Sequence, residues 1–196
     1  MKLIVLTAPS GAGKTTLARR LMEAVPALRF SVSATTRPPR PGERHGVDYF
    51  FLTLGEFDAE IEAGGFVEHE EVYPGRFYGT LRRELDRIAT DAAAGGGAAV
   101  LDIDVKGALN VKRLYGETAL TVFIAPPSLE TLSERLHARG TEGEARIAVR
   151  LERAEMEMRT APEFDRVIVN DDLDTATDEL VRLVRGFVGS GETAGG

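Results

Sequence analysis

Short apolar segments alternate along the chain with stretches in which apolar residues recur every three or four positions. Residues 2–7 and 98–104 are apolar over most of their length, a pattern typical of strands buried on both faces of a parallel sheet. Other segments have helical spacing, as in Leu17, Leu21 and Val25, which predicts helices that pack one face against the sheet. This alternation predicts an α/β fold in which a parallel β-sheet is flanked by helices.

The same patterns predict the other elements. Thr53 and Glu56 form a capping-box sequence that opens a helix ending near Gly64. The remaining predicted strands are 29–33, 49–52, 66–73, 121–125 and 166–170. The remaining predicted helices are 81–94, 144–159, one that begins at Ser128 and one that begins at Asp174. Residues 34–48 are predicted to form a loop, and the glycine-rich segment 189–196 is predicted to be disordered.

Composition and charge narrow the class of protein. The 196 residues include 24 Lys and Arg and 31 Asp and Glu, for a net charge of −7, whereas a broad nucleic-acid-binding surface is usually basic. The chain contains no cysteine, which excludes disulfide scaffolds, thiolate nucleophiles and Cys-ligated metal sites. No apolar run approaches the roughly 20 residues of a membrane helix. We therefore expect a cytoplasmic globular protein that binds neither nucleic acid nor membranes.

The segment after the first predicted strand is typical of a phosphate-binding loop. It reads Ala8-Pro-Ser-Gly11-Ala-Gly13-Lys14-Thr15, close to the Walker A pattern G-x-x-x-x-G-K-[ST]. The glycines let backbone N–H groups approach phosphate oxygens, Lys14 would neutralise the β- and γ-phosphates, and Thr15 would bind Mg²⁺. The predicted ATP-binding residues of this loop are Ser10, Gly11, Ala12, Gly13, Lys14, Thr15 and Thr16.

Two further features bear on this loop. Ala8 replaces the first glycine of the pattern, which would be strained if that position needs a positive φ. Asp102 ends an apolar strand in the manner of a Walker B aspartate, so we expect it to hold Mg²⁺ or a water bound to it.

Beyond the loop, the chain resembles the guanylate kinase family, whose members phosphorylate GMP with ATP. The resemblance covers about residues 3–188 and rests on motifs in a fixed order. After the phosphate loop these are SVSATTRPPRPGE at 31–43, GVDYFF at 46–51, FYGT at 77–80, LDID at 101–104, the arginines of 135–139 and VNDD at 169–172. The resemblance implies a Mg²⁺-dependent P-loop kinase that makes GDP in purine metabolism and GMP recycling, acts on GMP or dGMP, and is a monomer or small homo-oligomer.

The resemblance also implies a division of the chain. Residues 1–33, 81–125 and 151–188 would form the P-loop core, and 189–196 a disordered tail. Residues 34–80 would form a GMP-binding subdomain and 126–150 a lid. Both inserts interrupt the strand–helix alternation, so we expect them to be mobile.

By the same resemblance, Arg37, Arg40, Tyr49 and Tyr78 hold the GMP phosphate, and Ser33, Glu68 and Thr80 read guanine. A carboxylate at position 68 can accept the guanine N1–H and 2-amino hydrogens, which adenine lacks. Asp102 is predicted to contact the substrate and also to hold the metal, whereas Asp104 could serve either the metal or GMP. Taken singly, these residues are more typical of solvated loop charges, core aromatics and a solvated acidic run. Their order beside a phosphate loop favours the functional interpretation.

The third set of implied residues acts on ATP, the phosphoryl donor. Arg135, Arg139 and Arg150 match family arginines that close over ATP and, with Lys14, form the predicted catalytic set. Asn170 would contact the ATP nucleoside. Arg146 shares the helix face of Arg150 without matching a family position.

Four points stay open at the level of sequence. The chain has one residue more than the family pattern in the turn 73–76, and Lys106 stands where the family commonly has Gln. A guanylate-kinase-like module that binds protein ligands without catalysis is an alternative, which Lys14 and Thr15 argue against. A kinase of sugar phosphates is another, which the guanine-reading set argues against.

Overall fold

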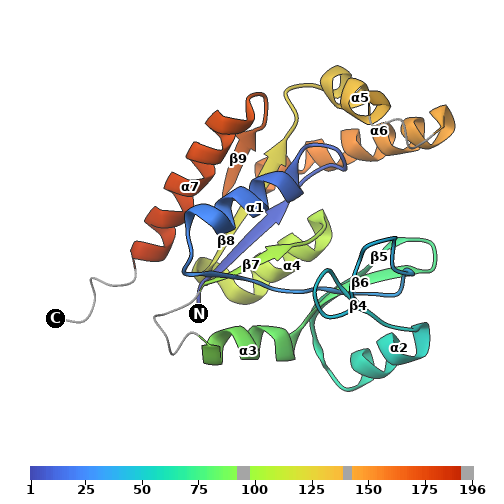
Figure 1. The fold of residues 1–196 in the computed structure, drawn as a ribbon, viewed down its shortest axis with the longest axis vertical. Coiled ribbons are helices and arrows are strands. Elements are labelled where there is room, and N and C mark those ends of the chain that lie inside the picture. The colour runs from blue at the N-terminus through green and yellow to red at the C-terminus, as the bar shows by residue number, and fades with distance from the viewer. Residues whose placement is uncertain (92–97, 139–142, 191–196) are drawn as a thin grey trace.

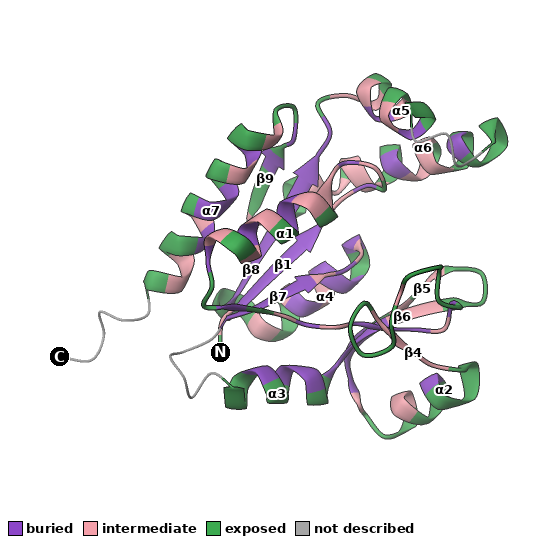
Figure 2. Ribbon diagram, viewed as in Figure 1, coloured by how far each residue is buried: buried purple, intermediate pink, exposed green. Residues whose placement is uncertain are grey.

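A five-stranded parallel sheet forms the centre of the computed structural model, which describes residues 1–91, 98–138 and 143–190 (Figure 1). The strand order is β2-β7-β1-β8-β9. The strands are β1 (Leu3–Thr7), β2 (Leu28–Phe30), β7 (Ala98–Asp102), β8 (Ala119–Ala125) and β9 (Arg166–Val169). All five residues of β1 are buried (Figure 2). The predicted α/β fold with a parallel sheet flanked by helices is confirmed.

Alternate residues of β1 face the two helical layers. Ile4 and Leu6 belong to a core cluster with α1 (Lys14–Ala24) and α7 (Leu173–Gly189). Leu3 and Val5 belong to a second cluster with α3 (Arg82–Asp91) and α4 (Val105–Tyr115). Short 3₁₀ turns at Gly116–Thr118 and Ala161–Glu163 precede β8 and β9. The strands β1, β7 and β8 are therefore buried on both faces, as their apolar sequences predicted. The edge strand β9 exposes Val167 and Val169.

A second, mixed sheet has its own small core. Its order is β4-β3-β6-β5, and its strands are β3 (Ala34–Thr35), β4 (Phe50–Phe51), β5 (Phe66–Tyr73) and β6 (Arg76–Leu81). Helix α2 (Leu54–Glu62) covers it through Phe57, which packs with Phe66 and Leu81. The predicted capping box is confirmed, because Glu56 N–H donates to Thr53 Oγ1 (3.2 Å) and Thr53 N–H donates to Glu56 Oε2 (2.7 Å).

Two further helices project from the central sheet on the same side as the second sheet (Figure 1). Helix α5 (Leu129–Ala138) and helix α6 (Glu144–Arg159) share an apolar cluster formed by Leu132, Leu136, Ile147 and Ala154. Helix α6 is continuous from its first residue to its last. Within the described ranges, no helix is both long enough and apolar enough to cross a membrane.

The structure corrects several predicted boundaries. The strand expected at 29–33 ends at Phe30, and the chain re-enters a strand at Ala34 in the second sheet, inside the predicted loop. Between the two, Val32 N–H donates to the Glu84 carboxylate (3.3 Å) instead of to a neighbouring strand. The helix expected from residue 81 begins at Arg82, because Leu81 completes β6. At the other end of the chain, α7 extends through Gly189, whereas 92–94 and 191–196 lie outside the described residues.

Helix α4 was not predicted from the sequence. Asp104 is its N-cap and accepts hydrogen bonds from the N–H groups of Lys106 (2.9 Å) and Gly107 (3.3 Å). Val105 and Ala108 are buried on its inner face. An aspartate followed by apolar residues at helical spacing is a helix-start signal, whereas the apolar run at 98–104 predicts only a strand.

Candidate functional site

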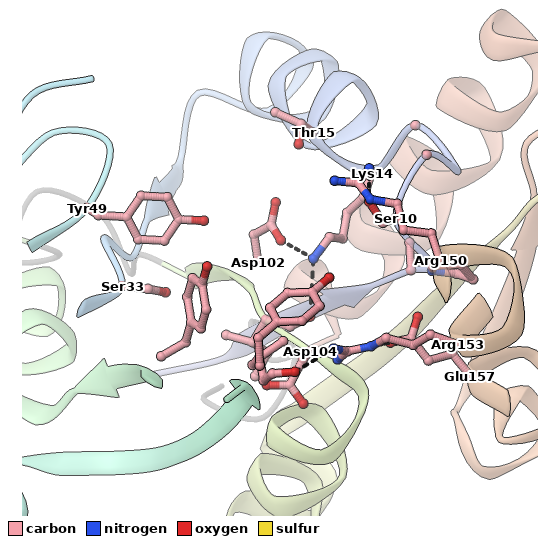
Figure 3. Close-up of a pocket in the computed structure, with 18 of the residues that line it drawn as sticks. Ser10, Lys14, Thr15, Ser33, Tyr49, Asp102, Asp104, Arg150, Arg153 and Glu157 are labelled. Atoms are coloured by element: carbon pink, nitrogen blue, oxygen red, sulfur yellow. Dashed lines mark hydrogen bonds and ion pairs between the residues drawn. The ribbon is translucent and has the colours of Figure 1, made fainter. Parts of the chain in front are cut away.

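A cleft of about 770 Å³ lies where the carboxyl ends of β1 and β7, the second sheet and α6 meet (Figure 3). Ligand sites of open parallel sheets lie at this end of the strands. The predicted site residues that line the cleft are Ser10, Gly11, Gly13, Lys14, Thr15, Thr16, Ser33, Arg40, Tyr49, Glu68, Tyr78, Asp102 and Arg150. Tertiary folding thus brings together residues that are up to 140 positions apart in the chain.

The loop between β1 and α1 has the backbone that the glycine pattern predicted. Gly11 and Gly13 have φ values of 104° and 95°, in the left-handed region that favours glycine. A Cβ on Gly13 would also collide with Asn170 Nδ2. Ala8 is not among the residues with positive φ, which in the described ranges are all glycines. The replacement of glycine by Ala8 is therefore free of the backbone strain considered above.

Lys14 reaches from the first turn of α1 to the end of β7. Its Nζ forms an ion pair with Asp102 and donates to the carbonyl of Ile103 (3.2 Å). Both ion-pair partners are about one-fifth exposed and line the cleft. Thr15 is exposed beside them. A cation, a carboxylate and a hydroxyl thus line the cleft at the mouth of the phosphate-type loop.

Asp102 and Asp104 have different surroundings, although both line the cleft. Asp102 pairs with Lys14, whereas Asp104 Oδ1 accepts from the first turn of α4. Lys106 is exposed next to that cap and is not among the cleft-lining residues.

Glu68 is a buried carboxyl group, only 6% exposed, on β5. Thr80 Oγ1 donates to its Oε1 (2.6 Å), and a Cβ on Gly107 would lie 2.5 Å from its Oε2. Burial, opposed by the Thr80 hydrogen bond and reinforced by the negative charge of Asp104, raises the pKa of Glu68 to about 7. Ser33, 8% exposed, lines the cleft with Glu68. This corner of the cleft can therefore accept hydrogen bonds from a ligand in a nearly dry environment.

Arg37 lies behind the cleft wall and is 6% exposed. Its Nη1 and Nη2 donate to the two carboxylate oxygens of Glu43 (2.6 and 2.7 Å). Its guanidinium carbon is 4.8 Å from the centre of the Tyr49 ring, and burial raises the pKa of that tyrosine. The hydrogen bonds from Arg37 lower the pKa of Glu43 to about 2. Arg40 lines the cleft, and its backbone N–H also donates to Glu43 (2.7 Å).

Glu43 therefore organises this loop, although no role was predicted for it. The only sequence signal for this role was the position of Glu43, three residues after Arg40. Tyr49 and Tyr78 stand edge to face beside the loop, with ring centres 6.1 Å apart.

Six predicted residues lie outside the cleft lining or outside the described residues. Arg37, described above, is one of them, and Ala12 is another, fully buried within the loop. Asn170 is buried, and its Nδ2 donates to the carbonyl of Ala12 (2.7 Å), which ties the end of β9 to the phosphate-type loop. Arg135 donates to the carbonyls of Asn170 (3.0 Å) and Asp171 (3.4 Å). Thr80 is buried beneath Glu68. Arg139 falls outside the described residues.

Helix α6 contributes cleft residues that sequence reasoning did not assign. Arg146, Arg153 and Glu157 line the cleft together with Arg150, whose Nη1 donates to Ser10 Oγ (3.3 Å). Positions 146, 150, 153 and 157 are spaced by three and four residues, so they share one helix face. That spacing was visible in the sequence, but only the fold shows that this face turns toward the cleft.

The cleft can thus hold two phosphorylated ligands that face one another. One wall offers the loop amides, Lys14 and the α6 arginines, and the other offers Arg40 and two tyrosines. Glu68 and Ser33 line the cleft as well. Backbone amides and cations of this kind are the usual means of binding phosphate oxygens.

Comparisons with known proteins agree on one family. A sequence profile described as guanylate kinase matches residues 1–186. A guanylate kinase from Salinibacter ruber is 56% identical over 188 residues, covering 96% of this chain and 97% of the relative. One from Chlorobium chlorochromatii is 51% identical, covering 96% of each. The crystal structure of a guanylate kinase from Anaplasma phagocytophilum has a TM-score of 0.76 at 33% identity, covering 95% of this chain and 86% of that one.

Proposed function

The chain belongs to the guanylate kinase family, and from that membership we propose that it transfers the γ-phosphoryl group of ATP to GMP or dGMP, releasing ADP and the nucleoside diphosphate. It acts as a nucleoside monophosphate kinase of purine nucleotide metabolism and GMP recycling. The observation that carries the proposal is the cleft, which has a phosphate-binding loop on one wall and the buried carboxyl of Glu68 on another.

Glu68, with Ser33 and Thr80, reads the guanine base. The hydrogen bond from Thr80 Oγ1 holds one oxygen of the carboxylate in place. When ionised, the carboxylate accepts the N1–H and 2-amino hydrogens of guanine. Adenine offers neither donor and would leave the buried charge unpaired, which is the kind of mismatch that gives selectivities of about 10⁴-fold.

Arg40, Tyr49 and Tyr78 bind the GMP phosphate from the cleft wall. Arg37 contributes its charge from behind Tyr49. Direct contact between Arg37 and the phosphate would require Glu43 to release one of the guanidinium nitrogens that it now holds.

The loop 10–16 and Lys14 bind the phosphates of ATP. Asn170 supports the loop through the carbonyl of Ala12, and by its correspondence with the family it contacts the ATP nucleoside. Arg150, which contacts Ser10, faces the transferred phosphoryl group. Arg135 and Arg139 complete this cationic set by their correspondence with the family.

The oxygen atoms at the loop mouth fit a magnesium ion. Thr15 offers a hydroxyl and Asp102 a carboxylate, and Mg²⁺ is commonly held by one or two protein oxygens together with substrate phosphates and water. Magnesium would neutralise charge on the β- and γ-phosphates. Asp102 would then exchange its ion pair with Lys14 for the metal, leaving Lys14 available to the phosphates.

The chemical step requires no protein nucleophile. An oxygen of the GMP phosphate attacks the γ-phosphorus of ATP, and ADP leaves on the opposite side. The protein contributes alignment of the two phosphates and positive charge around the transferred group. Exclusion of water from the cleft prevents the loss of ATP to hydrolysis.

The architecture supports the proposed division of the chain. Residues 34–80 include the GMP-binding sheet, 126–150 form a lid, and 1–33, 81–125 and 151–188 form the core. The second sheet and the α5–α6 pair each have a separate apolar cluster, which would let them move relative to the core. We place this activity in the cytoplasm, where ATP and GMP are available, in a monomer or small homo-oligomer.

A substrate panel tests the function. ADP release is measured in a coupled assay with ATP, Mg²⁺ and, in turn, GMP, dGMP, AMP, CMP and UMP. We expect turnover with GMP and dGMP and at most trace turnover with the other three. Absence of GMP-dependent ADP release would refute the proposal, and equal use of AMP would refute the role of Glu68.

Lys14→Ala tests the phosphate loop. We expect the turnover rate to fall by about 10³-fold, because a charge that stabilises the transition state is lost. The thermal midpoint should change little, since Lys14 is at the cleft surface. Lys106→Ala is the matched control, because this exposed lysine lies outside the cleft lining, and it should retain wild-type turnover. Wild-type turnover in Lys14→Ala would contradict the assignment.

A further inference from the structure

Arg153 joins helix α6 to the second sheet. Its Nη1 donates to the carbonyl of Val72 on β5 (2.6 Å), and its guanidinium carbon lies 4.8 Å from the centre of the Tyr73 ring. Its Nε donates to Glu157 one turn later on α6 (2.7 Å). The side chain is 29% exposed. The Val72 carbonyl, the Tyr73 ring and the Glu157 carboxylate together hold the guanidinium in one orientation.

This contact spans two parts of the molecule that have separate apolar cores. The second sheet packs around Phe57 and Phe66, whereas α6 packs on α5 through Ile147 and Ala154. The two clusters share no residue. Apart from the central core cluster, against which Val67 of β5 and Met158 of α6 both pack, the polar contact of Arg153 is a direct link between the two parts.

Helix α6 also reaches the phosphate loop, where the phosphoryl donor ATP is proposed to bind. Arg150 donates to Ser10 in the phosphate loop, and Arg153 lies three residues later on the same face. At the other end of the link, β5 carries both Val72 and the base-reading Glu68. Figure 3 shows Arg150, Arg153 and Glu157 projecting from α6 toward the cleft. A continuous path thus runs from the phosphate loop through α6 to the strand beside the proposed base site.

We propose that Arg153 is a positioning residue that couples the acceptor and donor sites, so that binding of GMP favours the α6 position in which Arg150 faces the ATP phosphates. The inference rests on the proposed function. By linkage, ATP must then strengthen GMP binding by the same factor by which GMP strengthens ATP binding. Arg153 itself need not contact either nucleotide.

The test measures that coupling. The dissociation constant of GMP is determined by calorimetry with and without saturating Mg²⁺ and a non-hydrolysable ATP analogue. For the wild type we expect the analogue to tighten GMP binding on the order of tenfold. In Arg153→Ala the ratio should fall close to one, while the affinity for GMP alone changes less than about twofold. The turnover rate should fall by a factor similar to the lost coupling.

Matched variants separate coupling from stability. Arg159→Ala removes an exposed arginine that is paired with Glu155 on the same helix, and it should keep full coupling. Tyr73→Phe keeps the ring and should behave as wild type, whereas Tyr73→Ala should lose part of the coupling. These Tyr73 variants test the link even if Arg153→Ala is unstable.

The outcomes are distinct. Wild-type coupling in Arg153→Ala, or no coupling in a wild-type enzyme that phosphorylates GMP, would overturn the inference and leave the proposed function standing. Lack of GMP-dependent turnover in the wild type would instead refute the proposed function.

Discussion

Glu68 carries the main electrostatic consequence at the residue scale. Its folded-state pKa of about 7 lies above the ordinary value of 4.5 because the group is buried and lies near Asp104. The protonated form is therefore favoured by folding, and the stability that this group contributes decreases as the pH rises from about 4.5 to about 7. The proposed recognition of guanine by Glu68 requires the opposite, ionised form. Ligand recognition and folding thus place opposing demands on one carboxyl group.

This opposition predicts a pH-dependent affinity for GMP. Between about pH 8 and about pH 6 the KM for GMP should rise about tenfold, because a proton must leave Glu68 before the base can bind. In Glu68→Gln the contribution of Glu68 to this step should vanish, leaving only the pH dependence that the GMP phosphate causes, while the overall KM is higher. The GMP phosphate titrates in the same range in both enzymes, so the variant also serves as the control. An unchanged KM profile in Glu68→Gln would exclude Glu68 as the titrating group.

Other residues show how partners decide the role of a side chain. Arg37 has the motif position of a phosphate ligand, yet its terminal nitrogens are bound to Glu43. Asn170 has the position of a nucleotide contact, yet its amide holds the phosphate loop. The residue type was foreseeable in each case, but its hydrogen-bond partner was not.

At the scale of elements, helix α4 borders the proposed base site through a glycine. Gly107 lies in its first turn, and the absence of a Cβ leaves room for Glu68 Oε2. Sequence periodicity did not reveal this helix, because its start overlaps the apolar strand that precedes it. The face of α4 that carries Gly107 lies next to β5.

Gly107→Ala should therefore separate stability from recognition. Alanine favours a helix interior by about 0.5–1 kcal/mol over glycine, but the added Cβ would lie 2.5 Å from Glu68 Oε2 and displace it. We expect the KM for GMP to rise about tenfold or more, with an unfolding free energy within about 1 kcal/mol of wild type in urea titrations.

Gly55→Ala in α2 is the matched control. Nothing lies within 4 Å of a Cβ at that position, so the variant gains helix propensity without touching the site. Its kinetics should equal those of the wild type. A wild-type KM in Gly107→Ala would show that Glu68 tolerates displacement.

At the scale of the whole molecule, two projecting parts flank one cleft. The second sheet and the α5–α6 pair lie on the same side of the central sheet (Figure 1), and each has its own apolar cluster. Such an arrangement allows closure with little disturbance of either core.

We expect small-angle scattering to detect this closure. The radius of gyration should decrease when GMP and a non-hydrolysable ATP analogue are added with Mg²⁺. The analogue with AMP should produce a smaller change, because Glu68 does not engage adenine. Identical profiles with and without both ligands would contradict closure.

The sequence by itself determined the alternation of strands and helices, the capped helix α2, the full extents of β5 and α6, and the phosphate-loop backbone. These features depend on local periodicity, caps and glycine conformation, which are encoded within a few neighbouring residues. Only the tertiary structure decided that Gly107 makes room for Glu68, that Glu43 holds Arg37, and that Arg153 reaches Val72. Each of these depends on which distant segments meet, and a periodic pattern records that a face is buried without recording what lies against it.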